Sequence, residues 1–284
     1  RGVETVYDTW QELLDDERVE ILDIAYPPDQ QLGIIREAVK RPHIKGILAQ
    51  KPVAFTLDEA VEMVRLCDEA GIKLGVNHNM RYDQSMRALR SLLDAGALGE
   101  PIVAEIVMNA RPHWQGFLQG YGRIALLNMS IHHLDAFRFQ FGDPERIFVS
   151  VRDDPSQDFP HKDGSAFYIL EYASGLRAIG LDNCYTWADH NIQWRVEGTE
   201  INIIFLADLM SASGGCNSLS GGFEIGEVLT AGPFASTMMA CEPALMDQAV
   251  WLNDFLSSLP TIELDGETLT LASGDTTMII DELQ

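Results

Sequence analysis

Apolar runs and helically spaced apolar residues alternate along the first hundred positions of the chain. The apolar runs at 19–25, 44–49 and 72–76 predict three strands. Helical spacing, capping patterns such as Thr56-x-x-Glu59 and glycine stops predict helices at 9–16, 29–40, 56–70 and 83–95. Strands that alternate with helices of this length are typical of a parallel sheet with right-handed crossovers.

From about residue 101 the chain shows strand patterns joined by turn residues. The expected strands are 101–110, 146–151, 165–173, 176–183 and 192–197. Sequential strands joined by tight turns such as Asp163-Gly164 predict a largely antiparallel sheet. The apolar segment 124–141 predicts a buried helix, 245–259 and 267–284 predict further helices, and the Ser- and Gly-rich segment 211–222 predicts a mobile loop.

The change of pattern predicts two domains. Residues 1–99 are expected to form an α/β domain around a parallel sheet, and residues 100–284 an α+β domain around a largely antiparallel sheet. Because 46% of the 284 residues are hydrophobic, the chain has enough apolar side chains for cores of this size.

The chain is strongly acidic, with a formal net charge of −23 from 20 basic and 43 acidic side chains. This charge repels nucleic acid and anionic membranes, so we expect neither as a partner. The four cysteines are scattered, which argues against a disulfide framework or a zinc site, and we expect a cytoplasmic protein without a bound metal. We expect no signal peptide and no membrane span, because no apolar run approaches roughly 18 residues.

Polar or proline-constrained segments follow the expected strands, at 26–28, 50–52 and 77–82. In open parallel sheets, ligands bind just beyond the carboxyl ends of the strands. Lys51 precedes a proline, which favours an extended backbone, so its side chain can project from the sheet edge. We interpret Lys51 as a candidate for proton transfer. The alternative interpretation is an ordinary surface lysine beside a turn.

The apolar helix expected at 124–141 holds the second candidate. Asn128, His132 and Asp135 lie at positions i, i+4 and i+7 and therefore share one face. An imidazole takes up and releases protons near neutral pH, while Asn128 can hold a substrate hydroxyl or fix the imidazole tautomer. The alternative is a core histidine satisfied by Asp135 or by a backbone carbonyl. His133 lies off this face and is expected to be structural.

Several short motifs follow one another in a specific order. They are the segments 19–27 and 96–101, Gln50-Lys51-Pro52, Asn79-Met80-Arg81-Tyr82-Asp83, Asn128…His132…Asp135, Asp163-Gly164 and the turn at 197–200. In this order they resemble the Gfo/Idh/MocA family of NAD(P)-dependent oxidoreductases. The resemblance implies a Rossmann-type dinucleotide domain, here partial, followed by an open-faced sheet domain that contacts the substrate. It also implies NAD or NADP as cofactor.

The resemblance implies a catalytic lysine and histidine, which by position are Lys51 and His132. Asn128 stands where the family usually has aspartate, Gln50 replaces the glutamate that precedes the lysine, and Gln31 stands where histidine is frequent. The two replaced carboxylates should lower the pKa of Lys51 and of His132 relative to relatives that keep them.

Further ligand contacts are implied by the same resemblance. The candidate cofactor contacts are Tyr26, Pro27, Gln31, Gln50, Lys51, Pro52, Asn79 and Arg81, and the candidate substrate contacts are Tyr82, His113, Trp114, Asn128 and His132. The sequence contains no G-x-G-x-x-G, the element that cradles a pyrophosphate. We therefore expect that part of the dinucleotide domain lies upstream of this sequence, and that the chain as given binds a dinucleotide poorly.

The expected function is hydride transfer between a nicotinamide and a sugar, polyol or related hydroxy compound, in a homo-oligomer whose exposed apolar sheet surface seeks a partner. One alternative is a family member that binds without catalysis. Another is an enzyme that uses transient oxidation for elimination or glycosidic cleavage.

Overall fold

The computed structural model describes residues 5–110, 116–155, 157–184 and 191–206, and beyond these the strands named below. The chain divides into two compact units: residues 1–79 with 116–121, and residues 80–115 with 122–284. Each unit is described by itself.

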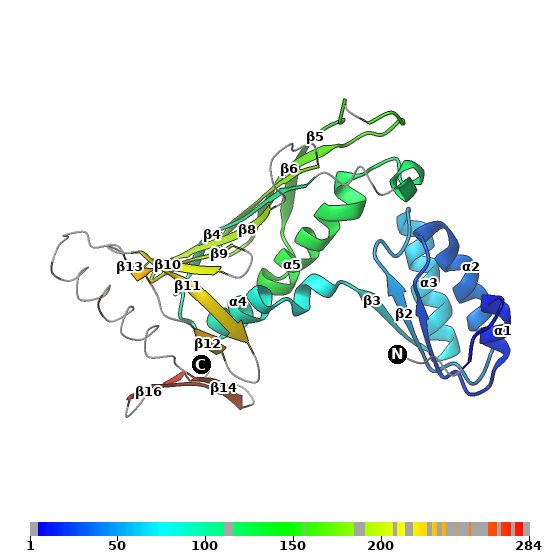
Figure 1. Cartoon of the computed structure of the whole chain (residues 1–284), viewed down its shortest axis with the longest axis horizontal. Helices are drawn as coiled ribbons and strands as arrows, with labels where there is room; N and C mark the ends of the chain where they lie inside the picture. The colour runs from blue at the N-terminus through cyan, green and yellow to red at the C-terminus, as the bar shows by residue number, and fades with distance from the viewer. Residues whose placement is uncertain are drawn as a thin grey trace. The chain divides into compact units, whose positions relative to one another are not determined.

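The first unit is built around a parallel three-stranded sheet, as the alternating pattern predicts. Its strands are β1 (Ile21–Ile24), β2 (Gly46–Gln50) and β3 (Lys73–Asn77), in the order β1-β2-β3 (Figure 1). Its helices are α1 (Trp10–Asp15), α2 (Pro28–Ala38), α3 (Leu57–Ala70) and the short η2 (Gly116–Gly120). The prediction of strands alternating with helices is confirmed.

Local sequence signals fix the ends of α3. The side chain of Thr56 accepts a hydrogen bond from the backbone N–H of Glu59, and the Glu59 carboxylate accepts one from the backbone N–H of Thr56. These two bonds satisfy N–H groups that have no partner inside the helix. At the other end Gly71 has φ of 69°, a left-handed conformation that glycine adopts without a steric penalty.

One face of the small sheet packs against helices. Leu22, Ile24 and Ile47 are buried with Ile35 of α2 and Met63 of α3. Alternation along the strands places their neighbours on the opposite face, where Ile21 of β1 is 74% exposed. Because the three strands are parallel, the segments that follow them all leave the sheet at the same edge.

The second unit is a ten-stranded, largely antiparallel sheet. The strands run in the order β12-β11-β10-β9-β8-β4-β7-β6-β5, with β13 paired to β11, and among the described strand pairs of this sheet β4 and β7 alone run parallel. The first strands are β4 (Pro101–Asn109), β5 (Arg146–Arg152), β6 (Ser165–Glu171), β7 (Arg177–Asn183) and β8 (Asn191–Gly198). They continue with β9 (Asn202–Leu206), β10 (Leu209–Ser213), β11 (Ser218–Ile225), β12 (Leu229–Ala231) and β13 (Ala235–Ser236).

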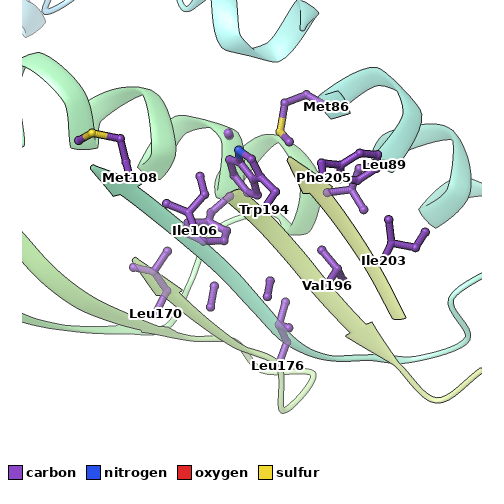
Figure 2. Close-up of a cluster of buried hydrophobic side chains, with 14 of the residues drawn as sticks. Met86, Leu89, Ile106, Met108, Leu170, Leu176, Trp194, Val196, Ile203 and Phe205 are labelled. Atoms are coloured by element: carbon purple, nitrogen blue, oxygen red, sulfur yellow. The ribbon is translucent and has the colours of Figure 1, made fainter. Parts of the chain in front are cut away.

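Helices α4 (Gln84–Asp94) and α5 (Ile131–Phe141) pack on one face of this sheet. Figure 2 shows Ile106 and Trp194 of the sheet in the same cluster of buried side chains as Leu89 of α4. On the opposite face large apolar side chains remain accessible, with Phe148 of β5 65% exposed and Phe167 of β6 43% exposed. The expected open-faced, largely antiparallel sheet is confirmed.

Two predictions about the last eighty residues are wrong. The segment 211–222 is not a loop, because its described residues belong to the antiparallel pair β10–β11. The segment 267–284 is not a helix, because β15 (Thr268–Ser273) pairs with β14 (Thr261–Asp265) and β16 (Thr276–Ile280). In 211–222, backbone hydrogen bonds between neighbouring strands hold serine and glycine in a strand whatever their side chains. In 267–284, the alternation in Thr268-Leu269-Thr270-Leu271 is typical of a strand. Most of the helix expected at 245–259 lies outside the described residues.

Among the described residues no helix is long and apolar enough to cross a membrane.

Candidate functional site

A row of polar side chains crosses the C-terminal edge of the parallel sheet. The Gln50 amide donates to the Asp23 carboxylate at 3.3 Å, and its oxygen accepts from the Asn77 amide at 3.0 Å. These residues end or nearly end β1, β2 and β3. An amide can donate to one neighbour and accept from the other, so Gln50 suits this position, where a carboxylate would face Asp23 with like charge.

Gln31 holds the segment that follows β2. It lies in the first turns of α2, is completely buried, and its amide nitrogen donates to the backbone oxygens of Gln50 and Pro52, both at 3.0 Å. Its amide oxygen accepts the backbone N–H of Gln50 at 2.9 Å. One side chain thus provides hydrogen-bond partners for backbone groups on both sides of Lys51.

Lys51 is partly buried at this held segment, and its peptide bond to Pro52 is cis. Burial lowers the pKa of the Lys51 ammonium from 10.5 to about 8, because the charged form loses water. Such a lysine can exchange a proton near neutral pH, which a solvated lysine does not. Partial burial and a lowered pKa distinguish Lys51 from an ordinary surface lysine beside a turn, which was the alternative interpretation.

The other expected cofactor contacts in this unit differ in accessibility. Tyr26, Pro27 and Asn79 are exposed beyond the ends of the strands, whereas Gln31 and Pro52 are buried. Exposed side chains are able to touch a bound ligand directly.

In the second unit the segment expected as one helix begins with a π-helical turn, η3 (Leu126–Ser130), before α5. The backbone N–H of Ile131 donates to the oxygen of Leu126, five residues earlier. A π turn widens the helix, and such turns are frequent at functional sites. Asn128 lies within it and is buried, while His132 follows in the first turn of α5 and is partly exposed.

One ion pair of the second unit joins Arg81 and Asp135, two residues of the expected motifs. Arg81 donates to both carboxylate oxygens of Asp135, at 2.6 and 2.7 Å, and its guanidinium lies 5.2 Å from the centre of the Phe139 ring. The Asp135 contact raises the pKa of Arg81. A bidentate pair stacked on an aromatic ring holds η1 (Asn79–Tyr82) to α5, the helix of His132.

A buried polar cluster next to His132 is missed by sequence reasoning. The adjacent His133 is fully buried, and its Nδ1 lies 2.6 Å from the Asp182 carboxylate, which also accepts the Tyr168 hydroxyl at 3.0 Å. Burial, together with Asp182, raises the pKa of Tyr168 well above its usual value. The expectation that His133 is structural agrees with this placement, but its partners come from β6 and β7 and share no local motif with it.

Asp163 is a second missed residue. Its fully buried carboxylate accepts the backbone N–H groups of Ala125 at 3.3 Å and Leu126 at 3.0 Å. These groups begin the helical segment that carries Asn128 and His132, so Asp163 caps it from a distance. The sequence marks Asp163-Gly164 as a turn and as one of the family motifs, but not as a helix cap.

A cavity of about 570 Å³ lies in the second unit beside this helical segment. Apolar side chains such as Met129 and Trp194 line it together with polar side chains at its rim, among them Asp83, Asn109 and Asn191. A mixed lining of this kind and size suits a small polar molecule. Tyr82 is 76% exposed, and His113 and Trp114 lie outside the described residues.

The residues at the C-terminal edge of the parallel sheet fit one part of a dinucleotide. Accessible polar groups and a lysine of lowered pKa lie around the loop after β2, at the edge where open parallel sheets bind their ligands. The sequence has no glycine-rich phosphate loop, so we assign no residue to the pyrophosphate.

Comparison with known proteins gives three domain matches. Residues 1–78 match the oxidoreductase family with an NAD-binding Rossmann fold, and residues 86–204 match the GFO/IDH/MocA C-terminal domain. Residues 185–283 match the META domain.

Curated relatives and solved structures agree with the first two matches. The chain is 29% identical over 181 residues to 1,5-anhydro-D-fructose reductase of Ensifer adhaerens, covering 62% of this chain and 52% of that protein. It is 30% identical over 159 residues to D-apiose dehydrogenase of Paraburkholderia graminis, covering 53% and 40%. An inositol dehydrogenase homologue from Azotobacter vinelandii, solved with NADH and myo-inositol, has a TM-score of 0.65 at 16% identity, covering 84% of this chain and 63% of that one.

The chain spans about half the length of the curated relatives it matches. The two family models together cover about two thirds of the chain. The fold in both units agrees with them. The chain therefore belongs to the Gfo/Idh/MocA family of oxidoreductases.

Proposed function

We propose that the protein transfers a hydride between the nicotinamide of NAD or NADP and the carbon that bears a hydroxyl group in a sugar, a polyol or a related compound. The observation that carries this proposal is Lys51, which Gln31 holds after β2 with a pKa of about 8. Relatives named as a reductase of anhydrofructose and a dehydrogenase of apiose support the substrate class.

The dinucleotide, when bound, supplies the hydride acceptor or donor, and the protein supplies binding, orientation and proton handling. His132 would take the hydroxyl proton of the substrate as general base. The Lys51 ammonium would stabilise the negative charge that develops on the same oxygen. Asn128 would hold the hydroxyl, and because Lys51 and His132 belong to different units, their action on one substrate is part of the proposal.

We assign further contacts by position. The residues that would contact the cofactor are Tyr26, Pro27, Asn79 and Gln50. The other residues expected at this site, Gln31, Pro52 and Arg81, would hold the contacting residues in place. Tyr82, His113 and Trp114 would contact the substrate. The domain limits 1–99 and 100–284 remain part of this proposal, with the first domain on the cofactor side and the second on the substrate side.

We also propose a homo-oligomer in the cytoplasm. The accessible apolar residues of β5 and β6, such as Phe148 and Phe167, are the surface expected between subunits. Cys67 and Cys184 are free and buried, as is common in a reducing compartment.

The test is a turnover assay of the full-length protein with NAD and NADP over a panel of sugars and polyols, with dinucleotide binding measured by calorimetry. We expect formation of reduced nicotinamide, and we expect Lys51→Met to lower turnover at least about a hundredfold. Dinucleotide binding without turnover on any substrate would favour a non-catalytic binding protein. A changed substrate without net reduced nicotinamide would favour transient oxidation followed by elimination or cleavage.

A further inference from the structure

The backbone around Lys51 is held by a single side chain from another element. Gln31, nineteen positions upstream of Gln50, donates to the backbone oxygens of Gln50 and Pro52 at 3.0 Å and accepts the backbone N–H of Gln50 at 2.9 Å. A longer contact of 3.4 Å reaches the backbone oxygen of Val53. The bonded groups flank Lys51 on both sides, so the Lys51 backbone has little freedom to rotate or shift.

The chemistry of these contacts requires an amide or a close mimic. Two close backbone acceptors, a third at 3.4 Å and one backbone donor face the Gln31 side chain. A glutamine amide carries two N–H donors and one oxygen acceptor in one plane. Gln31 is 0% exposed, so water does not replace a lost bond. The neighbouring Ile34, Ile35 and Ala38 fix α2 in the core and hold the amide in place.

We propose that Gln31 is a positioning residue that sets the place of the Lys51 ammonium through the backbone of residues 50–53. The inference rests on the catalytic role proposed for Lys51. Its physical content, that the Gln31 amide determines how Lys51 is buried, can be measured without any reaction.

The depressed pKa of Lys51 supplies the readout. Burial of the ammonium is the cause of its lowered value of about 8, and the segment that Gln31 holds determines that burial. If the segment is released, the ammonium gains water and its pKa returns toward 10.5. A role of Gln31 in fold stability alone would not move this value in protein that remains folded.

The variants are Gln31→Met, which keeps the length and removes the hydrogen bonds, and Gln30→Met as matched control. Gln30 is the same residue type on the same helix but is exposed. The whole chain is modified with an amine-selective reagent at a series of pH values, and mass spectrometry of the peptide that contains Lys51 gives the midpoint for Lys51. We expect a midpoint near 8 for the unmodified sequence and for Gln30→Met, and a rise of at least about one pH unit in Gln31→Met.

Two further variants keep the test decisive if Gln31→Met does not fold. Gln31→Asn retains an amide but draws it back by one methylene, and it should raise the midpoint as well. Gln31→His can donate with one ring nitrogen and accept with the other, and it should restore part of the depression. An unchanged midpoint in folded Gln31→Met or folded Gln31→Asn would overturn the proposal.

Turnover distinguishes this inference from the proposed function. In an active protein, Gln31→Asn should lower kcat at least about tenfold with little change in KM, because a misplaced catalytic group affects chemistry more than binding. A raised Lys51 midpoint in a protein that shows no turnover would uphold the positioning role and refute the oxidoreductase proposal. A raised KM with an unchanged kcat in Gln31→Asn would overturn the positioning role.

Discussion

Burial of the Lys51 charge should lower the free energy of unfolding of the protein. Its pKa falls from 10.5 in a solvated chain to about 8 in the folded state, because burial takes water away from the charged form. One unit of pKa difference corresponds to about 1.4 kcal/mol, so the shift amounts to about 3 kcal/mol against folding. This value is an upper bound, because Lys51 is partly exposed and keeps some water.

The pH dependence of this cost has a definite sign. Between pH 8 and 10.5 the unfolded chain binds more protons at Lys51 than the folded chain does, so the free energy of unfolding rises with pH in that window. Below pH 8 the cost is present in full, because the lysine is charged in both states. Above 10.5 it is absent, because the lysine is neutral in both states.

Lys51→Met removes the charge and keeps the length of the side chain. We expect this variant to be more stable than the unmodified protein at neutral pH, by up to about 3 kcal/mol, and the difference to shrink as pH rises toward 10. Urea unfolding at a series of pH values measures both quantities. Lys73→Met, at an exposed position of β3, is the control and should change stability little at any pH.

Two outcomes would refute this reasoning. The first is a Lys51→Met variant that is less stable than the unmodified protein at neutral pH, which would show that the ammonium makes favourable contacts that outweigh its burial. The second is a stability difference that does not depend on pH, which would show that the folded and unfolded states bind the Lys51 proton equally.

Three other predictions concern named contacts. Tyr168→Phe should lower the free energy of unfolding by about 1–3 kcal/mol, because the buried Asp182 carboxylate loses a donor, and an unchanged thermal midpoint would contradict this. Arg81→Lys should lower it by about 1–2 kcal/mol, because lysine cannot replace two parallel bonds to Asp135, and equal urea midpoints would argue against that reading. The rate of hydride transfer should fall as pH rises through about 8, because only the protonated Lys51 stabilises an alkoxide, and a rate that keeps rising with pH would exclude this role.

Local signals in the sequence account for most of the first unit. The capping box at Thr56 and the glycine at position 71 bound α3 as expected, because these signals act within a few residues. The prediction of a loop at 211–222 is wrong because the strand conformation there does not depend on local signals. Its serines and glycines are common in loops, but their strand conformation depends on pairing between β10 and β11, which no local pattern encodes.

The sequence identifies the candidate site residues but not the side chains that hold them in place. Lys51 and His132 are recognisable from motifs and from their apolar surroundings. The roles of Gln31, Asp163 and Asp182 depend on hydrogen bonds to segments 19 to 49 positions away, so their partners become visible only in the folded chain. The π turn before α5 is likewise invisible to a periodicity argument, because it changes the backbone bonding without changing the apolar pattern.

The central claim is that Lys51 and His132 act together on one substrate. A double-mutant cycle in the hydride-transfer assay tests it most directly, with Lys51→Met, His132→Gln and the double variant compared by kcat/KM. We expect each single variant to lose at least about a hundredfold and the double variant to lose little more, because groups that act as a unit are not additive. Near-normal turnover in either single variant, or losses that multiply in the double variant, would contradict the claim.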